Sequence, residues 1–235
     1  MKKLVLILSL ATVFVACKNE NKDGMATSDS STEMPKDDMS SEQQEAWKIA
    51  EAYGAEDWDK VKEVKFTFNV DRGGNHMERS WTWNPKTKDI TMKAGDDTVN
   101  YNRNDMDSLA VTSDKGFIND SYWLLAPLHL VWDDAKITVQ DTATAPISKD
   151  MMHKITLTYG GDAGGYTPGD AYDMFYGDDY VVKEWIYRSG NSPQPSMMTT
   201  WEDYEDIDGI KVAKTHKGPD GDFKLYFTNV AVETE

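Results

Sequence analysis

The sequence contains only one cysteine, Cys17, among its 235 residues. A disulfide bond joins two cysteines, so none can form within one chain. The fold is therefore expected to have no disulfide within the chain. If Cys17 is acylated, as its position suggests below, neither a catalytic thiol nor a cysteine ligand for a metal remains.

Histidine and the common catalytic motifs are also scarce. The four histidines, His76, His129, His153 and His216, fall on separate segments without a metal-ligand spacing such as H-E-x-x-H. The G-x-S-x-G nucleophile motif is missing, and the paired glycines between residues 160 and 165 lie in an acidic loop that would repel phosphate. These absences predict that the protein is not an enzyme and that it uses no cofactor.

Carboxylates, by contrast, are abundant, and two further interpretations depend on them. Acidic runs such as Asp162–Asp173 and Asp220–Asp222 could bind calcium, which prefers several oxygen ligands. Neither run has the EF-hand spacing, and aspartate is common in turns because its side chain bonds to nearby backbone, so no metal site is predicted. Paired carboxylates could also cleave glycosidic bonds, which leaves an extracellular hydrolase as one alternative function.

Basic residues are too few to balance the acidic ones. Lys and Arg number 25 against 41 Asp and Glu, which gives a formal net charge of −16. Nucleic acids and anionic membrane surfaces would be repelled electrostatically, so neither is an expected partner. With 39% apolar and 11% aromatic residues, the chain still has enough material for one buried core.

Long hydrophobic runs are missing except at the N-terminus. Lys2 and Lys3 precede the apolar run Leu4–Val15, which is too short to span a bilayer as a helix. This arrangement is typical of a secretory signal peptide. The tetrapeptide at 14–17, Phe-Val-Ala-Cys, resembles the lipobox of bacterial lipoproteins, in which the cysteine becomes the lipidated first residue of the mature protein.

The lipobox resemblance implies that residues 1–17 are a lipoprotein signal peptide and that Cys17 carries a lipid anchor. Several acyl chains would hold the protein at a membrane, because each buried methylene contributes about 0.8 kcal/mol. Lys18 stands where an aspartate commonly marks inner-membrane retention, so the expected location is the outer membrane, facing the periplasm or the cell surface. An ordinary secretory signal followed by a free thiol is the alternative.

A polar segment separates this N-terminal region from the rest. Residues 18–41 are rich in Ser, Thr, Asp, Glu, Lys, Asn and Met, and they cannot bury enough surface to offset their ordering entropy. They are predicted to be a disordered tether, and residues 42–235 a single domain. The first helix is expected to begin at Ser41, which forms a capping box with Gln44, and to stop at Gly54.

Most of the domain alternates apolar and polar residues with a period of two, which predicts half-buried strands. Val64, Phe66 and Phe68, for example, share one face of a strand. Glycine-containing turns such as Gly73-Gly74 and Asp208-Gly209 are typical of hairpins. Short connections of this kind predict an antiparallel meander of roughly ten strands.

The densest apolar stretch after the N-terminal run is GFINDSYWLLAPLHLVWDD, at 116–134. Asn119, Asp120 and Ser121 are good N-cap residues, so a short helix is expected to start there. Pro127 would break or kink this helix, because proline has no N–H to donate. A kinked apolar helix between strands is expected to cover the concave face of a curved sheet, where it either fills the core or gates a pocket.

This order of elements resembles the LolA/LolB-like lipoprotein-localisation fold. The stretches AYGAEDWDKVKEVKFTF, FINDSYWLLAPLHL and WEDYEDIDGIKVAKTHK also resemble a group of uncharacterised bacterial outer-membrane lipoproteins that share the plan. The resemblance implies a mainly β fold, a curved antiparallel half-barrel with its concave face covered by the N-terminal helix and the central helical insertion. Arg79 and Arg103 are candidates for the arginine that locks the covering helix in that family.

The predicted concave face would carry large apolar side chains in one register. The expected lining residues are Phe66, Phe68, Trp81, Trp83, Trp123, Leu124, Trp185, Tyr187 and Trp201. They would form a cavity in which a lipid-anchored envelope protein binds or carries a lipid or another apolar small molecule. The alternative is an ordinary packed core, in which case the protein is a structural or interaction lipoprotein with a protein partner.

Overall fold

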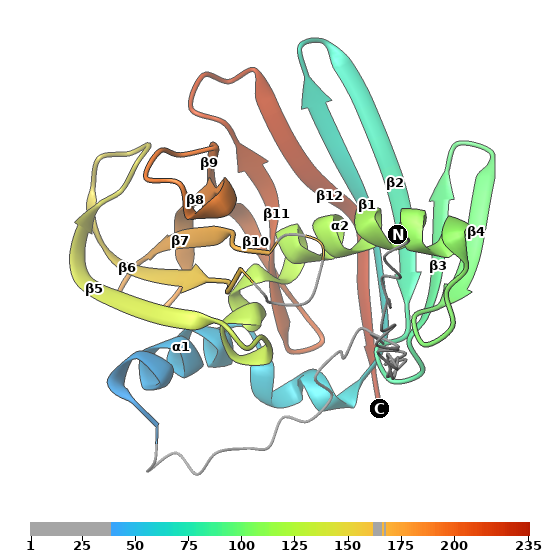
Figure 1. Ribbon diagram of the computed structural model, residues 1–235, viewed down its shortest axis with the longest axis horizontal. Coiled ribbons are helices and arrows are strands. Elements are labelled where there is room, and N and C mark those ends of the chain that lie inside the picture. Colours follow the sequence, from blue (N-terminus) through green and yellow to red (C-terminus); the bar gives the residue numbers. More distant parts are fainter. Residues whose placement is uncertain (1–38, 162–165, 167) are drawn as a thin grey trace, which may run out of the picture.

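The structure is a computed structural model that describes residues 39–161, 166 and 168–235. The predicted signal peptide, the lipidation site Cys17 and nearly all of the predicted tether lie outside the described residues. Figure 1 shows two β-sheets side by side, with helices across one face. The helices are α1 (Ser41–Ala52), η2 (Ala55–Lys60), α2 (Ser108–Trp132) and η3 (Ser189–Asn191), of which η2 and η3 are short 3-10 helices.

The larger sheet has seven strands, and every neighbouring pair is antiparallel. In spatial order they are β10 (Glu202–Ile207), β11 (Ile210–Lys217), β12 (Phe223–Thr234), β1 (Val61–Arg72), β2 (Asn75–Trp83), β3 (Asp89–Ala94) and β4 (Asp97–Asn102). The first and last described strands, β1 and β12, therefore pair at the centre of this sheet. All other neighbours are joined by hairpins.

The smaller sheet is a meander of five antiparallel strands. Its strands are β5 (Lys136–Thr144), β6 (Met151–Thr158), β7 (Ala171–Tyr176), β8 (Val182–Arg188) and β9 (Met197–Thr200). Only Trp201 separates β9 from β10, so at this residue the chain passes from the smaller sheet directly into the larger one.

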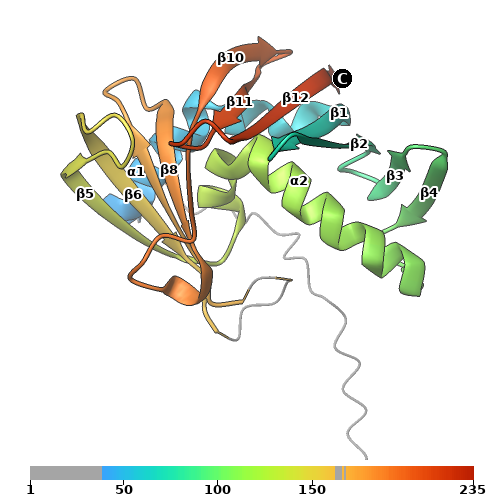
Figure 2. The same ribbon diagram turned by 90° about the horizontal axis from the view of Figure 1, so that it is seen from above.

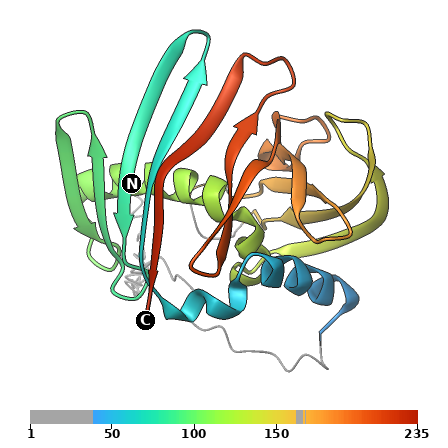
Figure 3. The same ribbon diagram turned by 180° about the vertical axis from the view of Figure 1, so that it is seen from behind.

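Together the two sheets form an open, curved surface rather than a closed barrel (Figure 2). Helix α2 lies on the concave side, whereas the view from behind shows the opposite side of β1, β2 and β12 without a covering helix (Figure 3). The predicted fold class, a mainly β antiparallel half-barrel covered by helices, is confirmed. None of the helices in the described part of the chain is both long and apolar enough to cross a bilayer.

Helix α1 begins at Ser41 as predicted, but its capping box lies one residue earlier than expected. Its capping box is formed by Ser40 and Gln43: the Ser40 hydroxyl accepts from the Gln43 amide, and the Gln43 side chain accepts from the Ser40 amide. The spacing of Ser41 and Gln44 is identical, so the sequence pattern fits both capping boxes. Glu42 lies in the first turn, where a negative charge favours the helix N-terminus.

The end of α1 follows the prediction. Gly54 has a φ of 89°, the left-handed conformation expected of a glycine after the last helical turn. A Cβ atom at this position would lie 2.1 Å from the backbone oxygen of Gly209. Glycine is therefore required both by the backbone conformation and by the close approach of the β10–β11 turn.

Helix α2 is much longer than predicted, and its start was wrong. It begins after Asp107, whose side chain accepts from the Ala110 amide at 2.8 Å, and it includes Asn119, Asp120 and Ser121 in its interior. The buried residues of its first four turns recur at helical spacing: Ala110, Ser113, Asp114, Phe117, Asp120 and Ser121. Several of these residues are polar, so the sequence does not show the apolar stripe by which an amphipathic helix is recognised.

The predicted kink is confirmed. Leu125 has non-helical backbone angles, φ −124° and ψ 15°, two residues before Pro127. Pro127 has no amide hydrogen for the carbonyl of Trp123, and its ring crowds that carbonyl. The helix nevertheless resumes and continues to Trp132, so α2 consists of two segments joined by irregular backbone at Leu125.

Candidate ligand site beneath helix α2

The predicted lining residues are brought together in one buried core between the sheets and α2. Seven of them, Phe66, Phe68, Trp81, Trp123, Leu124, Trp185 and Trp201, are buried, while Trp83 and Tyr187 are partly buried. They fall into two aromatic groups, one on β1 and β2 and one around Trp123. Phe227 lies between the groups, since its ring is 5.8 Å from Phe66 and 6.0 Å from His216.

The first group packs α2 onto the larger sheet. The ring of Phe117, on α2, lies 5.5 Å from Trp81 and 5.2 Å from Trp83 in edge-to-face geometry. Phe66 and Phe68 point to the same side of β1 and contact Phe227 in the same manner. Edge-to-face packing is favourable for aromatic rings, and this group has the character of an ordinary core.

The second group, here named the Trp123 group, consists of Trp123, Trp185, Trp201, His216 and Phe223. Trp123 projects from α2 next to the irregular backbone, and its ring centroid is 4.4 Å from Trp185 and 5.3 Å from His216. Trp201 completes the group at 4.5 Å from His216. The group thus joins residues from α2, both sheets and the single-residue link between them.

Several polar atoms of this group are buried without a hydrogen-bond partner. They are Nε1 of Trp185, Nε1 of Trp201, both ring nitrogens of His216, and Oγ1 of the neighbouring Thr199. Backbone groups of Thr200 and Ala213 approach the His216 ring, but not in hydrogen-bond geometry. All four residues are at most 3% exposed. Leaving a buried donor or acceptor unpaired costs about 1–3 kcal/mol for each group, so the concentration of such atoms in one place calls for a physical explanation.

Burial also determines the charge of His216. Its side chain is completely enclosed, and desolvation lowers its pKa to about 3. The ring is therefore neutral at physiological pH and offers one N–H donor and one acceptor nitrogen. Apart from this neutral ring, the Trp123 group contains no ionisable side chain.

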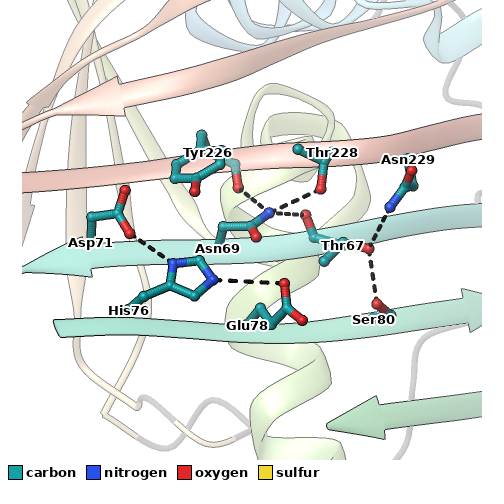
Figure 4. A network of polar contacts seen from close by, with 9 residues as sticks. All are labelled: Thr67, Asn69, Asp71, His76, Glu78, Ser80, Tyr226, Thr228 and Asn229. Carbon is teal, nitrogen blue, oxygen red and sulfur yellow. Dashed lines mark hydrogen bonds and ion pairs between the residues drawn. The ribbon is translucent and has the colours of Figure 1, made fainter. Parts of the chain in front are cut away.

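Polar side chains on the opposite face of the larger sheet are hydrogen-bonded, in contrast to the unpartnered polar atoms of the Trp123 group. Thr67, Asn69 and Ser80 alternate with the inward-facing aromatic residues, so they lie on the outer side, where their polar atoms bond to one another (Figure 4). Asn69 Nδ2, for instance, donates to the backbone oxygens of Thr67 and Tyr226 at 3.0 and 3.2 Å. Thr228 and Asn229 are further partners of Asn69 and Thr67. On the same face, His76 pairs separately with Asp71 at 2.7 Å and with Glu78 at 3.6 Å.

Two shallow hollows, of about 610 and 290 Å³, also lie on the larger sheet. The smaller one is lined largely by outward-facing polar residues of β1, β2 and β3, such as Thr67 and Lys93. Neither hollow lies between the sheets beneath α2. Among the described residues, no group of His, Cys, Asp and Glu has the arrangement of a metal site.

Helix α2 is held over the core by a buried carboxylate. Asp120 is fully enclosed, and its two oxygens accept from Arg79 Nε at 3.0 Å, Arg79 Nη2 at 2.7 Å and Trp81 Nε1 at 2.8 Å. The adjacent Asn119 side chain adds a bond of 2.9 Å. A Cβ atom at Gly116 would come within 3.2 Å of the Arg79 guanidinium, so a glycine leaves room for this arginine against the helix.

A second buried carboxylate repeats the arrangement nearer the start of the helix. Asp114 is fully enclosed, lies 3.0 Å from Arg103 Nε, and accepts from the hydroxyls of Tyr101 at 3.0 Å and Tyr166 at 3.2 Å. The two arginines singled out in the sequence, Arg79 and Arg103, therefore both bind α2. Their partners were missed because Asp120 was interpreted as an N-cap residue and Asp114 lies before the predicted start of the helix.

The C-terminal segment of α2 is attached differently. His129 bonds to Asp133 at 2.8 Å, and Tyr159, which follows β6, donates to the same carboxylate at 2.5 Å. Burial opposes ionisation of Asp133, but His129 and Tyr159 together hold its pKa below the usual range. These contacts connect the end of α2 to the smaller sheet, whereas Asp114 and Asp120 connect its beginning to the larger sheet.

Comparison with known proteins identifies similar structures only. No protein-family model matches the sequence, and no curated protein is similar to it. The structure is similar to a LolA superfamily protein from Nitrosomonas europaea, with a TM-score of 0.49, 10% identity, and 84% of this chain and 96% of that chain covered. A DUF1329 family protein from Desulfovibrio piger gives a TM-score of 0.48 at 11% identity, covering 81% and 91% of the two chains.

A third similar structure is a candidate outer-membrane lipoprotein-sorting protein domain from Vibrio parahaemolyticus. Its TM-score is 0.47 at 8% identity, with 82% of this chain and 94% of that chain covered. At such identities the similarity concerns the arrangement of the backbone, and it includes no assignment of ligand or residue roles.

Proposed function

We propose that this protein is a lipid-anchored protein of the bacterial outer membrane that binds an apolar or amphiphilic small molecule between its two sheets. Helix α2 is the removable cover of the site, and the role is binding or carrying rather than catalysis. The observation that carries the proposal is the attachment of α2: two buried ion pairs hold its N-terminal segment, and irregular backbone at Leu125 separates this segment from the rest.

Ion pairs suit a cover that must open and close. A buried ion pair adds little net stability, because the attraction between the charges is offset by the loss of their hydration. When the helix moves away, the charged groups of Arg79 and Asp120 regain their hydration. The free-energy cost of opening is therefore lower than it would be if the helix were held by apolar contacts alone. The bidentate geometry of this pair still fixes the position of the closed helix.

The irregular backbone at Leu125 supplies the position of the hinge. The segment 108–124 would swing about this point while the segment 126–132 remains attached through His129 and Asp133 to the smaller sheet. Trp123 lies two residues before the hinge on the moving side, so opening would withdraw its indole from Trp185 and His216. The withdrawn ring leaves space lined by apolar and aromatic side chains, which is the usual character of a small-molecule site.

The location follows from the N-terminal sequence. The lipobox resemblance at residues 14–17 and the lysine at position 18 support a lipid anchor at Cys17 in the outer membrane. The polar segment 18–41 would then hold the domain away from the membrane surface. A site that opens at the membrane can exchange apolar molecules without exposing them to bulk water for long.

The test measures whether loosening α2 opens a site. The chain from residue 18 to residue 235 contains the whole described domain and can be titrated with N-phenyl-1-naphthylamine, whose fluorescence rises in apolar surroundings. Asp120→Asn removes the charge that holds the cover and should tighten the apparent Kd about tenfold, since the open state becomes more populated. Phe175→Leu, in a separate small cluster with Ala143 and Ala145, is the matched destabilising control.

The outcome decides between two functions. Stronger dye binding by Asp120→Asn than by Phe175→Leu, together with lipid detected on the native protein by mass spectrometry, supports a covered ligand site. Equal dye responses of the two variants would contradict the cover. If no dye or lipid binds and a protein partner is cross-linked in envelope fractions, the alternative function is supported, a structural lipoprotein with a packed interior.

A further inference from the structure

The unpartnered atoms beneath α2 restrict the chemistry of a ligand. The indole nitrogens of Trp185 and Trp201 can only donate, neutral His216 provides one donor and one acceptor, and the Thr199 hydroxyl can do either. Donors therefore predominate in this group. A ligand that pairs with them must present hydrogen-bond acceptors, such as carbonyl oxygens.

The charge of the site restricts the ligand further. No Lys or Arg belongs to the Trp123 group, and His216 stays neutral in its enclosed position. An anion would lose its hydration there without gaining a cationic partner, which is strongly unfavourable. The whole chain, with a net charge of −16, also repels anions. The ligand must accordingly be uncharged.

The indole of Trp123 occupies the site in this structure, and it indicates the shape of the ligand. The indole of Trp123 is a flat ring that lies 4.4 Å from Trp185 at an interplanar angle of 56° and 5.3 Å from His216 in edge-to-face geometry. Phe223 contacts the same indole at 6.5 Å. When Trp123 withdraws, these surrounding rings favour another flat ring, because offset and edge-to-face packing of aromatic rings is favourable beyond the burial of area.

We propose that the Trp123 group binds a neutral, planar ring system bearing carbonyl oxygens, of the quinone class, which replaces the indole of Trp123 and accepts hydrogen bonds from Trp185, Trp201 and His216. This inference rests on the proposed function, since α2 must open for the exchange. In the closed state the indole of Trp123 satisfies the shape of the site but none of its donors. The ligand satisfies both.

The experiment uses two compounds of equal shape. 2,3-Dimethyl-1,4-naphthoquinone carries two carbonyl oxygens and no free position for addition of a nucleophile, whereas 2,3-dimethylnaphthalene lacks the oxygens. Binding of each to the chain from residue 18 to residue 235 is measured by titration calorimetry. The quinone should bind at least about tenfold more tightly than the hydrocarbon, because it alone pairs with the buried donors.

Two variants separate shape from hydrogen bonding. Trp123→Ala removes the internal competitor and should tighten the binding of both compounds. His216→Phe keeps a ring of similar size but removes the polar atoms, so it should reduce the preference for the quinone while leaving the hydrocarbon unchanged. Circular dichroism and thermal melting confirm that each variant is folded.

Each result either supports or overturns the inference. Equal affinity of the two compounds, or an unchanged preference in His216→Phe, overturns it. Binding of N-phenyl-1-naphthylamine without binding of either naphthalene compound overturns the inference but leaves the proposed function intact. No binding of any of the three to the wild-type chain or to Trp123→Ala overturns both.

Discussion

The carboxylate of Asp120 offers the sharpest test of how α2 is held. It is fully buried and accepts four hydrogen bonds, two of them from one guanidinium. Asp120→Asn preserves the size of the side chain but removes the charge and replaces one acceptor oxygen with an amide that cannot accept. Arg79 and the Trp81 indole N–H then compete for a single oxygen.

The expected cost can be worked out from the burial of the partners. Removing one member of a buried ion pair typically costs about 3–5 kcal/mol, because the other charge is left unpaired. The Arg79 side chain is 29% exposed and can recover some hydration, so we expect a loss near the lower end, about 3 kcal/mol. Urea unfolding followed by tryptophan fluorescence gives this free energy directly.

A double-mutant cycle distinguishes the ion pair from general loss of packing. Arg79→Gln alone should also destabilise the domain, but Arg79→Gln combined with Asp120→Asn should cost less than the sum of the two single changes, since the pair is already broken. Amide exchange should accelerate in 108–124 more than in 126–132. A loss below about 0.5 kcal/mol for Asp120→Asn, or strictly additive effects, would refute the reasoning.

Three further predictions concern other residues. Burial lowers the pKa of His216 from 6.5 to about 3, so below pH 6.5 the unfolded chain binds a proton that the folded chain does not. The free energy of unfolding therefore decreases by about 1.4 kcal/mol for each unit by which the pH is lowered between these two pKa values. Relative to wild type, His216→Phe should therefore gain about 2 kcal/mol between pH 7 and pH 5 in urea unfolding, and parallel pH dependences of the two proteins would contradict this. Ser40→Ala should cost about 1 kcal/mol through loss of the capping box, whereas Ser41→Ala, the matched control, should be nearly neutral; equal melting temperatures of the two variants would argue against the cap. Cys17→Ala should abolish incorporation of an alkyne-labelled fatty acid in bacterial cells, and labelling that persists in this variant would rule out a lipid anchor at Cys17.

The strands were predictable because local alternation reports burial directly. Val64, Phe66 and Phe68 are buried on one face of β1 as their spacing indicated. Gly73 and Gly74, the predicted hairpin turn, both have positive φ. The inward position of Arg79 also followed from its register with Trp81, although its partner did not.

The start of α2 and the role of its acidic residues could not be predicted in the same way. Asp114 and Asp120 occupy core-facing positions, but a carboxylate is tolerated there only because an arginine neutralises it: Arg103, directly after β4, for Asp114 and Arg79, on β2, for Asp120. That compensation is a property of the three-dimensional arrangement and leaves no local pattern. The unpartnered polar atoms of Trp185 and His216 could not be predicted either. Trp185 was expected only as an apolar lining residue, and His216 was noted only as one of four scattered histidines.

The pairing of β1 with β12 has a consequence for how the polypeptide acquires its shape. Residues 61–72 and 223–234 are far apart along the chain, yet they form the middle of the seven-stranded sheet. Contacts between such distant segments slow folding, since a long loop must close before they form. A polypeptide that is made N-terminus first therefore cannot complete the centre of its larger sheet until residues 223–234 are available.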